Sequence, residues 1–130
     1  MLSPEELQAG LAQFTGTETW YRYRFGQETL AYYTDGVKYL TNNAECYWLL
    51  MEIVSAQVEA NVHKEPFQTW ELLVDENRRA TLTCEDGNRV SVFTKVIQFT
   101  DFPLEEIKLW VEYGEIEGAN KPIVLLPSEH

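Results

Sequence analysis

The side chains best suited to ligand binding are concentrated in residues 20–35, where tyrosines and arginines alternate. Aromatic rings beside guanidinium groups can stack on a planar ligand or a peptide and pair with its charge. The candidate binding residues of this stretch are Tyr21, Arg22, Tyr23, Arg24, Tyr33 and Asp35. The same alternation also describes a strand whose rings pack in the core or pair across strands, and this simpler interpretation is favoured. If the chain has a binding site, we expect it here.

The only internal histidine, His63, is a candidate ligand for a bound group. Its imidazole could act as a general base or as an axial metal ligand, although an exposed loop histidine is the simpler expectation. One hypothesis is therefore a carrier of a planar hydrophobic molecule such as haem, with His63 or a tyrosine as the iron ligand. No C-x-x-C-H sequence is present, so such binding would be noncovalent.

Motifs for catalysis are absent from the sequence. It contains no G-x-S-x-G elbow, no glycine-rich phosphate loop and no H-E-x-x-H sequence. The 21 acidic residues are too many for any one carboxylate pair to be singled out. We therefore name no catalytic residue, no metal site and no cofactor, and the sequence leans away from an enzyme.

Net charge restricts the class of partner. The 130 residues include 21 acidic and 10 basic side chains, for a net charge of −11. This charge argues against direct binding to nucleic acid or to anionic lipid and favours a basic protein partner. The net charge is −5 in residues 1–60, −1 in residues 61–100 and −5 in residues 101–130. We expect acidic helices to cover a nearly neutral sheet, with the arginine-bearing hairpin as a local exception.

The compartment is predicted from features that the sequence lacks. The first residues have no basic and apolar signal segment, and no apolar run reaches the roughly 20 residues that span a bilayer. Cys46 and Cys84 lie in apolar contexts without a C-x-x-C motif, which favours free buried thiols over a disulfide. The expectation is a cytoplasmic protein without membrane contact.

Hydrophobic periodicity and turn residues predict an α+β fold in a single domain over residues 1–130. Ser3 and Glu6 form a capping-box pattern before a short amphipathic helix, and Gly26 and Gln27 are suited to a hairpin turn. The predicted order is a helix ending near 15–17, strands 19–24 and 28–33, helices 35–40 and 44–61, strands 67–74, 80–84 and 90–99, a helix from 101 to Gly114, and a short strand 123–126. We expect an antiparallel sheet, a hairpin plus a three-strand meander, with helices packed on one face.

Four stretches carry a resemblance to a known family. They are residues 14–18 (FTGTE), 33–40 (YTDGVKYL), 101–109 (DFPLEEIKL) and 125–130 (LLPSEH). Together they resemble a family of small bacterial proteins classified only as a domain of unknown function. The likeness spans nearly the whole chain, so we expect a complete protein with a native C-terminal histidine. The family implies no activity, cofactor or site residue. For YTDGVKYL itself, turn chemistry at Asp35 and Gly36 favours a structural corner over a binding rim.

These observations lead to one principal hypothesis about function. We expect a non-catalytic binding or regulatory module that acts through protein contacts. The carrier of a planar hydrophobic ligand is the alternative, and a small enzyme that uses carboxylates ranks last. The oligomeric state is not determined by the sequence.

Overall fold

The computed structural model describes residues 2–16 and 19–130. The helical segments are α1 (Pro4–Leu11), α2 (Asp35–Asn43), α3 (Tyr47–Ala56), α4 (Ala60–His63) and the 3₁₀ turn η1 (Pro127–Glu129). The strands are β1 (Trp20–Phe25), β2 (Glu28–Thr34), β3 (Phe67–Val74), β4 (Ala80–Glu85), β5 (Ser91–Ile97), β6 (Glu106–Ile116) and β7 (Ala119–Leu125). The fold is α+β, as expected.

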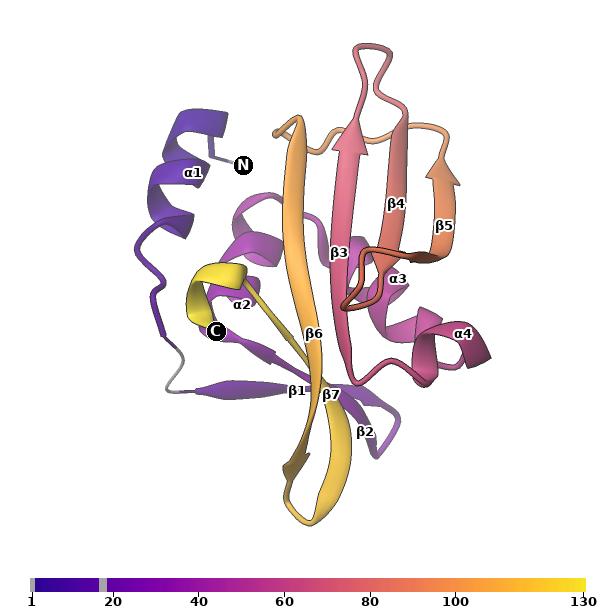
Figure 1. The fold of residues 1–130 in the computed structure, drawn as a ribbon. Helices are drawn as coiled ribbons and strands as arrows, with labels where there is room; N and C mark the ends of the chain where they lie inside the picture. The colour runs from indigo at the N-terminus through magenta and orange to yellow at the C-terminus, as the bar shows by residue number, and fades with distance from the viewer. Residues whose placement is uncertain (1, 17–18) are drawn as a thin grey trace.

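One seven-stranded, mostly antiparallel sheet contains all of these strands, in the order β1-β2-β7-β6-β3-β4-β5. The only parallel neighbours are β2 and β7. Figure 1 shows β6 passing through the middle of the molecule between β3 and β7. The expected hairpin and meander describe only the two ends of this sheet, because β7 and β6 are inserted between them.

Local signals account for the first elements. The Ser3 hydroxyl accepts the Glu6 backbone N–H while the Glu6 carboxylate accepts the Ser3 N–H, which confirms the capping box of α1. Residues 26 and 27 join β1 to β2, as the turn chemistry predicted. The predicted helix end at 15–17 is later than the observed end at Leu11, and residues 17 and 18 lie outside the described part of the chain.

The core lies against one face of the central strands. Buried residues alternate along β3 and β4, as expected for strands with one face in a core. These side chains share one hydrophobic cluster with side chains from α1, α2 and α3; its largest members include Trp70, Leu72, Leu82, Leu7, Leu40 and Ile53. Lys95 of β5 also forms an ion pair with Glu52 of α3, 2.8 Å apart.

The predicted final helix from residue 101 to Gly114 is wrong, because most of this segment is β6. Leu109 and Val111 are buried at period-two spacing, and β6 pairs with β3 on one side and β7 on the other. Gly114 does not end a helix but lies within β6 opposite Lys121. Two neighbouring strands satisfy the backbone of β6 on both sides, and this tertiary pairing outweighs a weak helical spacing.

The single helix predicted over residues 44–61 is also corrected, because α3 ends at Ala56 and a separate turn, α4, follows. Leu50 and Val54 of the predicted apolar stripe are buried, but Tyr47, Met51 and Val58 are exposed. The break allows the amide of Gln57 to exchange hydrogen bonds with the buried amide of Gln68.

The end of the described chain is bound to the start of α2. Thr34 donates its hydroxyl to Glu129 Oε1 at 2.6 Å, and the Gly36 N–H donates to Oε2 at 3.0 Å. The Leu126 N–H also donates to Oε1 at 2.9 Å. A carboxylate at a helix N-terminus is stabilised by the unpaired N–H groups there. This contact joins two of the stretches, 33–40 and 125–130, that resemble the family.

The structure also bears on charge and on the cysteines. The acidic residues of 101–130 lie largely on β6 and its turn, so the expected restriction of acidity to helices is wrong for this segment. Cys46 and Cys84 are both free and buried, as expected. Within the described ranges, no helix has the length and apolarity needed to span a membrane.

Candidate functional site

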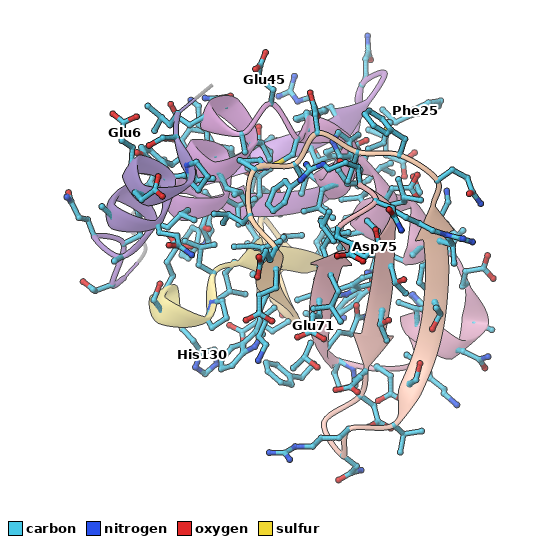
Figure 2. All side chains as sticks on the ribbon, turned by 90° about the horizontal axis from the view of Figure 1, so that it is seen from above. Glu6, Phe25, Glu45, Glu71, Asp75 and His130 are labelled. Carbon is cyan, nitrogen blue, oxygen red and sulfur yellow. The ribbon has the colours of Figure 1, made fainter. Side chains whose placement is uncertain are left out.

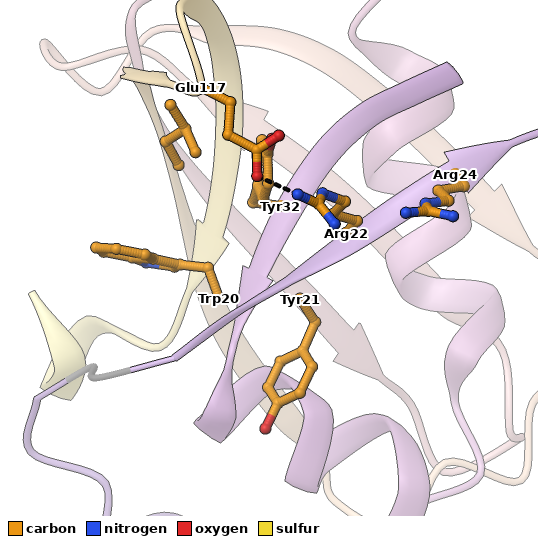
Figure 3. A pocket seen from close by; sticks show the side chains of 7 residues that line it. Trp20, Tyr21, Arg22, Arg24, Tyr32 and Glu117 are labelled. Carbon is orange, nitrogen blue, oxygen red and sulfur yellow. Dashed lines mark hydrogen bonds and ion pairs between the residues drawn. The ribbon is translucent and has the colours of Figure 1, made fainter. Parts of the chain in front are cut away.

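The β1–β2 hairpin separates its candidate residues onto two faces. Tyr21 and Tyr23 alternate with Arg22 and Arg24 along β1, so successive side chains point to opposite sides of the strand. Figure 3 shows Tyr21 pointing away from Arg22 and Glu117. The candidate residues therefore form two groups rather than one cluster.

The tyrosine face is turned toward α2. The Tyr21 hydroxyl donates to Asp35 Oδ1 at 2.8 Å, and the Lys38 ammonium lies 4.1 Å from the Tyr21 ring centroid. The Tyr33 ring is directly opposite, with ring centroids 5.6 Å apart. The hydrogen bond to Asp35 raises the pKa of Tyr21 because it would be lost if the phenol ionised. Tyr21, Tyr33 and Asp35 thus connect the hairpin to the first turn of α2.

Tyr23 makes a second connection, to α3. Its ring stacks on Tyr47 with an interplanar angle of 13° and a centroid distance of 5.8 Å. Burial raises the pKa of Tyr23 and that of Tyr33, because the charged phenolate is poorly solvated there. These contacts agree with the packing interpretation of the tyrosines, and the Tyr21 hydroxyl in addition keeps its hydrogen bond to Asp35.

The arginine face contains an open pocket of about 450 Å³. Arg22 forms an ion pair with Glu117 at the turn between β6 and β7, and hydrogen bonding to that carboxylate raises the pKa of Arg22. Tyr32, directly opposite Arg22 on β2, is nearly buried beneath the pair. Trp20 stands at the other side of the pocket with half of its surface exposed (Figure 3).

One further exposed side chain, that of Arg24, extends this face toward the hairpin turn. Arg24 forms no hydrogen bond, ion pair or ring contact within residues 2–16 and 19–130, and Phe25, which is 78% exposed, belongs to the tyrosine series of the strand. A bulge between Tyr23 and Arg24 shifts the register here. Since β1 is the first strand of the sheet, its outer backbone edge has no strand partner in the described chain. An unpaired edge offers N–H and C=O groups to an added strand.

His63 is separate from the hairpin. It is exposed at the end of α4, and its ring meets Tyr113 edge-on at a centroid distance of 6.0 Å. No contact among the described residues joins His63 to the candidate residues of β1 and β2. The predicted ligand set is therefore not a single site, and no observed contact favours His63 as an iron ligand.

Trp20 and Glu117 were missed as site residues by sequence reasoning. Trp20 occupies the same period-two series as Arg22 and Arg24, so the alternation could have included it. Glu117 could not be found in this way, because it is 95 positions from Arg22. Only the pairing of β2 with β7 brings it there.

The groups exposed at the hairpin can contact a ligand or a partner. These groups are a partly exposed indole, two guanidinium groups and a free strand edge, which can pack, pair with carboxylates and donate backbone hydrogen bonds. Among residues 2–16 and 19–130, no group of three His, Cys, Asp or Glu side chains is placed to hold a metal ion.

Fold and site together define a small α+β protein with an arginine- and tryptophan-bearing sheet edge. The chain belongs to the family of unknown function DUF6876, whose family model matches residues 5–130. Comparisons with curated proteins and with solved structures gave no match.

Proposed function

We propose that this protein is a non-catalytic binding or regulatory module that acts through protein contacts, with the outer face of β1 as its contact surface. The observation that carries the proposal is an unpaired edge strand that exposes Trp20, Arg22 and Arg24 on one face. Trp and Arg are the residue types that most often dominate binding energy at protein interfaces.

The back of the hairpin supports this role. Tyr21 is bound to Asp35 and Tyr23 is stacked on Tyr47, so the strand is attached to α2 and α3 before any partner arrives. A rigid surface loses less conformational entropy on binding than a mobile one. The tyrosines would thus act as positioning residues, and the outer side chains would make the contact.

Charge indicates what the partner presents to this surface. Residues 19–27 contain two arginines and no acidic residue, in contrast with the −11 of the whole chain. An extended segment with an apolar side chain and a carboxylate would suit Trp20 and the unpaired Arg24. An overall basic partner would in addition be attracted at long range by the acidic remainder of the protein.

A retention experiment with matched variants tests the proposal. The tagged protein is incubated with lysate of its source cells at low and high salt, alongside Trp20→Ala and Arg24→Glu. The control variants are Val58→Ala, at a residue 86% exposed outside the hairpin, and Lys64→Glu, at another exposed position. We expect a protein to be retained by the wild type and both controls, and to be lost with both hairpin variants.

Two outcomes would overturn the proposal. One is that the wild type retains no protein even at low salt, where electrostatic attraction is strongest. The other is that the retained protein binds the hairpin variants as well as it binds the wild type. Circular dichroism of each variant establishes that a loss of binding is not a loss of fold.

A further inference from the structure

The largest cleft of those described lies on the face of β3, β4 and β6 that does not carry the core. It has a volume of about 820 Å³, within the range of roughly 300–1,000 Å³ usual for small-molecule sites. The turn after β4 supplies one wall through Gly87 and Arg89, and η1 supplies another through Pro127. Figure 2 shows Glu71 and His130 on the opposite side of the molecule from Glu6 of α1 and from Glu45, which lies between α2 and α3.

Strand register orders the side chains of the cleft floor into two rows. In the first row, Thr69 is directly opposite Glu85 on one side and Trp110 on the other. In the second row, Glu71 is directly opposite Thr83 and Lys108. Side chains directly opposite each other have Cβ atoms about 4.5–5.5 Å apart. Rings, hydroxyls and charges of both signs therefore lie within the length of one small ligand.

An aromatic group forms one end of the cleft. The Phe67 and Trp110 rings meet edge-to-face with centroids 5.2 Å apart, and the His130 ring contacts Trp110 at the same distance. His130 is held in turn by Glu112, with Nε2 and Oε2 3.2 Å apart. These mutual contacts fix the rings, which gives a planar apolar ligand a preformed surface to pack against.

The charged groups of the cleft are not fully engaged with one another. Lys108 Nζ and Glu71 Oε2 are 3.9 Å apart, which is beyond hydrogen-bond distance, and the Lys108 side chain is 63% exposed. The side chains of Glu85 and Arg89 form no ion pair or hydrogen bond with any other residue of the described ranges. Glu85 and Arg89 are thus unpaired, and Glu71 and Lys108 form only a loose ion pair, so a ligand that carries both charges finds groups of each sign to contact.

We propose that this cleft binds a small aromatic zwitterion of the α-amino acid class. The ring packs against Trp110 and Phe67, the ammonium group pairs with Glu71 and Glu85, and the carboxylate pairs with Lys108 and Arg89. A ligand with only one charge would leave either the carboxylates or the cations of the cleft without a partner. The cleft should therefore bind a zwitterion more tightly than a singly charged analogue. The site is independent of the hairpin surface.

Calorimetric titration with L-phenylalanine, L-tyrosine and L-tryptophan tests the proposal. The matched probes are phenethylamine, which lacks the carboxylate, and 3-phenylpropanoate, which lacks the ammonium group. We expect saturable binding of at least one amino acid. Phenylalanine should bind at least about tenfold more tightly than either single-charge analogue, the scale of one lost charge-assisted hydrogen bond.

Variants locate the binding. Glu85→Gln and Lys108→Gln remove one charge each from exposed parts of the cleft and should weaken binding by a similar factor. Glu28→Gln and Lys121→Gln, which lie outside the cleft lining, should leave it unchanged. Amide chemical shifts of the isotope-labelled protein should move along β3, β4 and β6.

The proposal is overturned if none of the three amino acids binds saturably. It is also overturned if the single-charge analogues bind as well as phenylalanine, or if the shifts occur on the hairpin instead of the cleft. Equal binding by the cleft variants and the controls would exclude the assigned residues. None of these results bears on the hairpin variants, so failure here is distinguishable from failure of the protein-contact function.

Discussion

Gly36 occupies a position in the first turn of α2 where only a hydrogen fits. A Cβ atom there would lie 2.5 Å from Leu126 Cδ1 and 2.6 Å from Glu129 Oε1. Both are ends of side chains, but both residues are buried, and Glu129 is bound to Thr34 and to two backbone N–H groups. Moving the carboxylate would break hydrogen bonds in a site that water does not reach.

We therefore expect Gly36→Ala to lower the free energy of unfolding by about 1–3 kcal/mol, the usual cost of overpacking. A destabilisation is informative because alanine in a helix is otherwise more stable than glycine by up to about 1 kcal/mol. Urea denaturation measures the change.

Gly87→Ala is the matched control for this substitution. An added Cβ at Gly87 meets nothing within 4 Å, so its effect should stay within about 0.5 kcal/mol. If Gly36→Ala proves as stable as the wild type, the close packing of Glu129 against α2 is wrong.

At the scale of elements, the α3–α4 corner is attached to the sheet by one buried amide. The Gln68 amide nitrogen donates to Gln57 Oε1 and to the Val62 and Glu65 carbonyls, and its oxygen accepts from Gln57 and from Trp70 Nε1. The Tyr113 hydroxyl donates to Gln57 Oε1 from β6. This network satisfies the backbone where the helix breaks and joins it to two strands.

Gln68→Leu should therefore be strongly destabilising, although leucine is apolar and of similar size. The substitution leaves the buried Trp70 indole N–H without its partner, at a cost of about 1–3 kcal/mol, while the Val62 carbonyl still accepts the Glu65 N–H. Chemical denaturation gives the magnitude, and Gln98→Leu at an exposed position is the control. Equal stability of the two variants would show that the network contributes nothing.

The elements also show how far sequence reasoning reached. Strands β3, β4 and β5 and the hairpin were predicted, since their residue types and turns act over a few positions. Most of Glu106–Ile116 falls in the segment predicted as a helix from 101 to Gly114, whose apolar side was expected from Leu104, Ile107, Leu109, Trp110 and Val111. Its buried pair, Leu109 and Val111, also fits a strand, and only the presence of β3 and β7 decides between the two.

At the scale of the whole molecule, burial raises the pKa of several thiol and phenol groups. It raises the pKa of both thiols, Cys46 and Cys84, to about 12. Burial also raises the pKa of Tyr23, Tyr33 and Tyr113. An unfolded thiol titrates near 8.5, so above about pH 9 the unfolded state releases protons that the folded state keeps.

These groups should consequently leave the free energy of unfolding unchanged below about pH 8 and lower it as pH rises from about 9 toward 12. Urea denaturation at several pH values measures the slope. In a variant with both cysteines replaced by alanine the fall between about pH 9 and 10 should be shallower, because two of the groups responsible are gone. A stability that rises over this range would contradict the shifts. Thiol reagents should label the folded protein much more slowly than the unfolded one.

Some features of the candidate site depend on neighbouring residues, and others depend on residues that are far apart in the sequence. The sequence identified the hairpin and its alternating tyrosines and arginines, because strand alternation is a property of neighbouring residues. It could not show that the tyrosines connect to α2 and α3, nor that Glu117 pairs with Arg22. The cleft on β3, β4 and β6 escaped prediction because it requires β6 to be a strand.

By itself, the sequence determined the α1 capping box, the hairpin turn, the α+β class and the burial of both cysteines. These follow from side chains acting on their own backbone and from apolar periodicity. The tertiary structure alone decided that β7 lies between β2 and β6, and that Glu129 reaches Thr34 from 95 positions away. Such pairings depend on which distant groups can bury apolar surface and satisfy each other's hydrogen bonds together, and no local pattern records that choice.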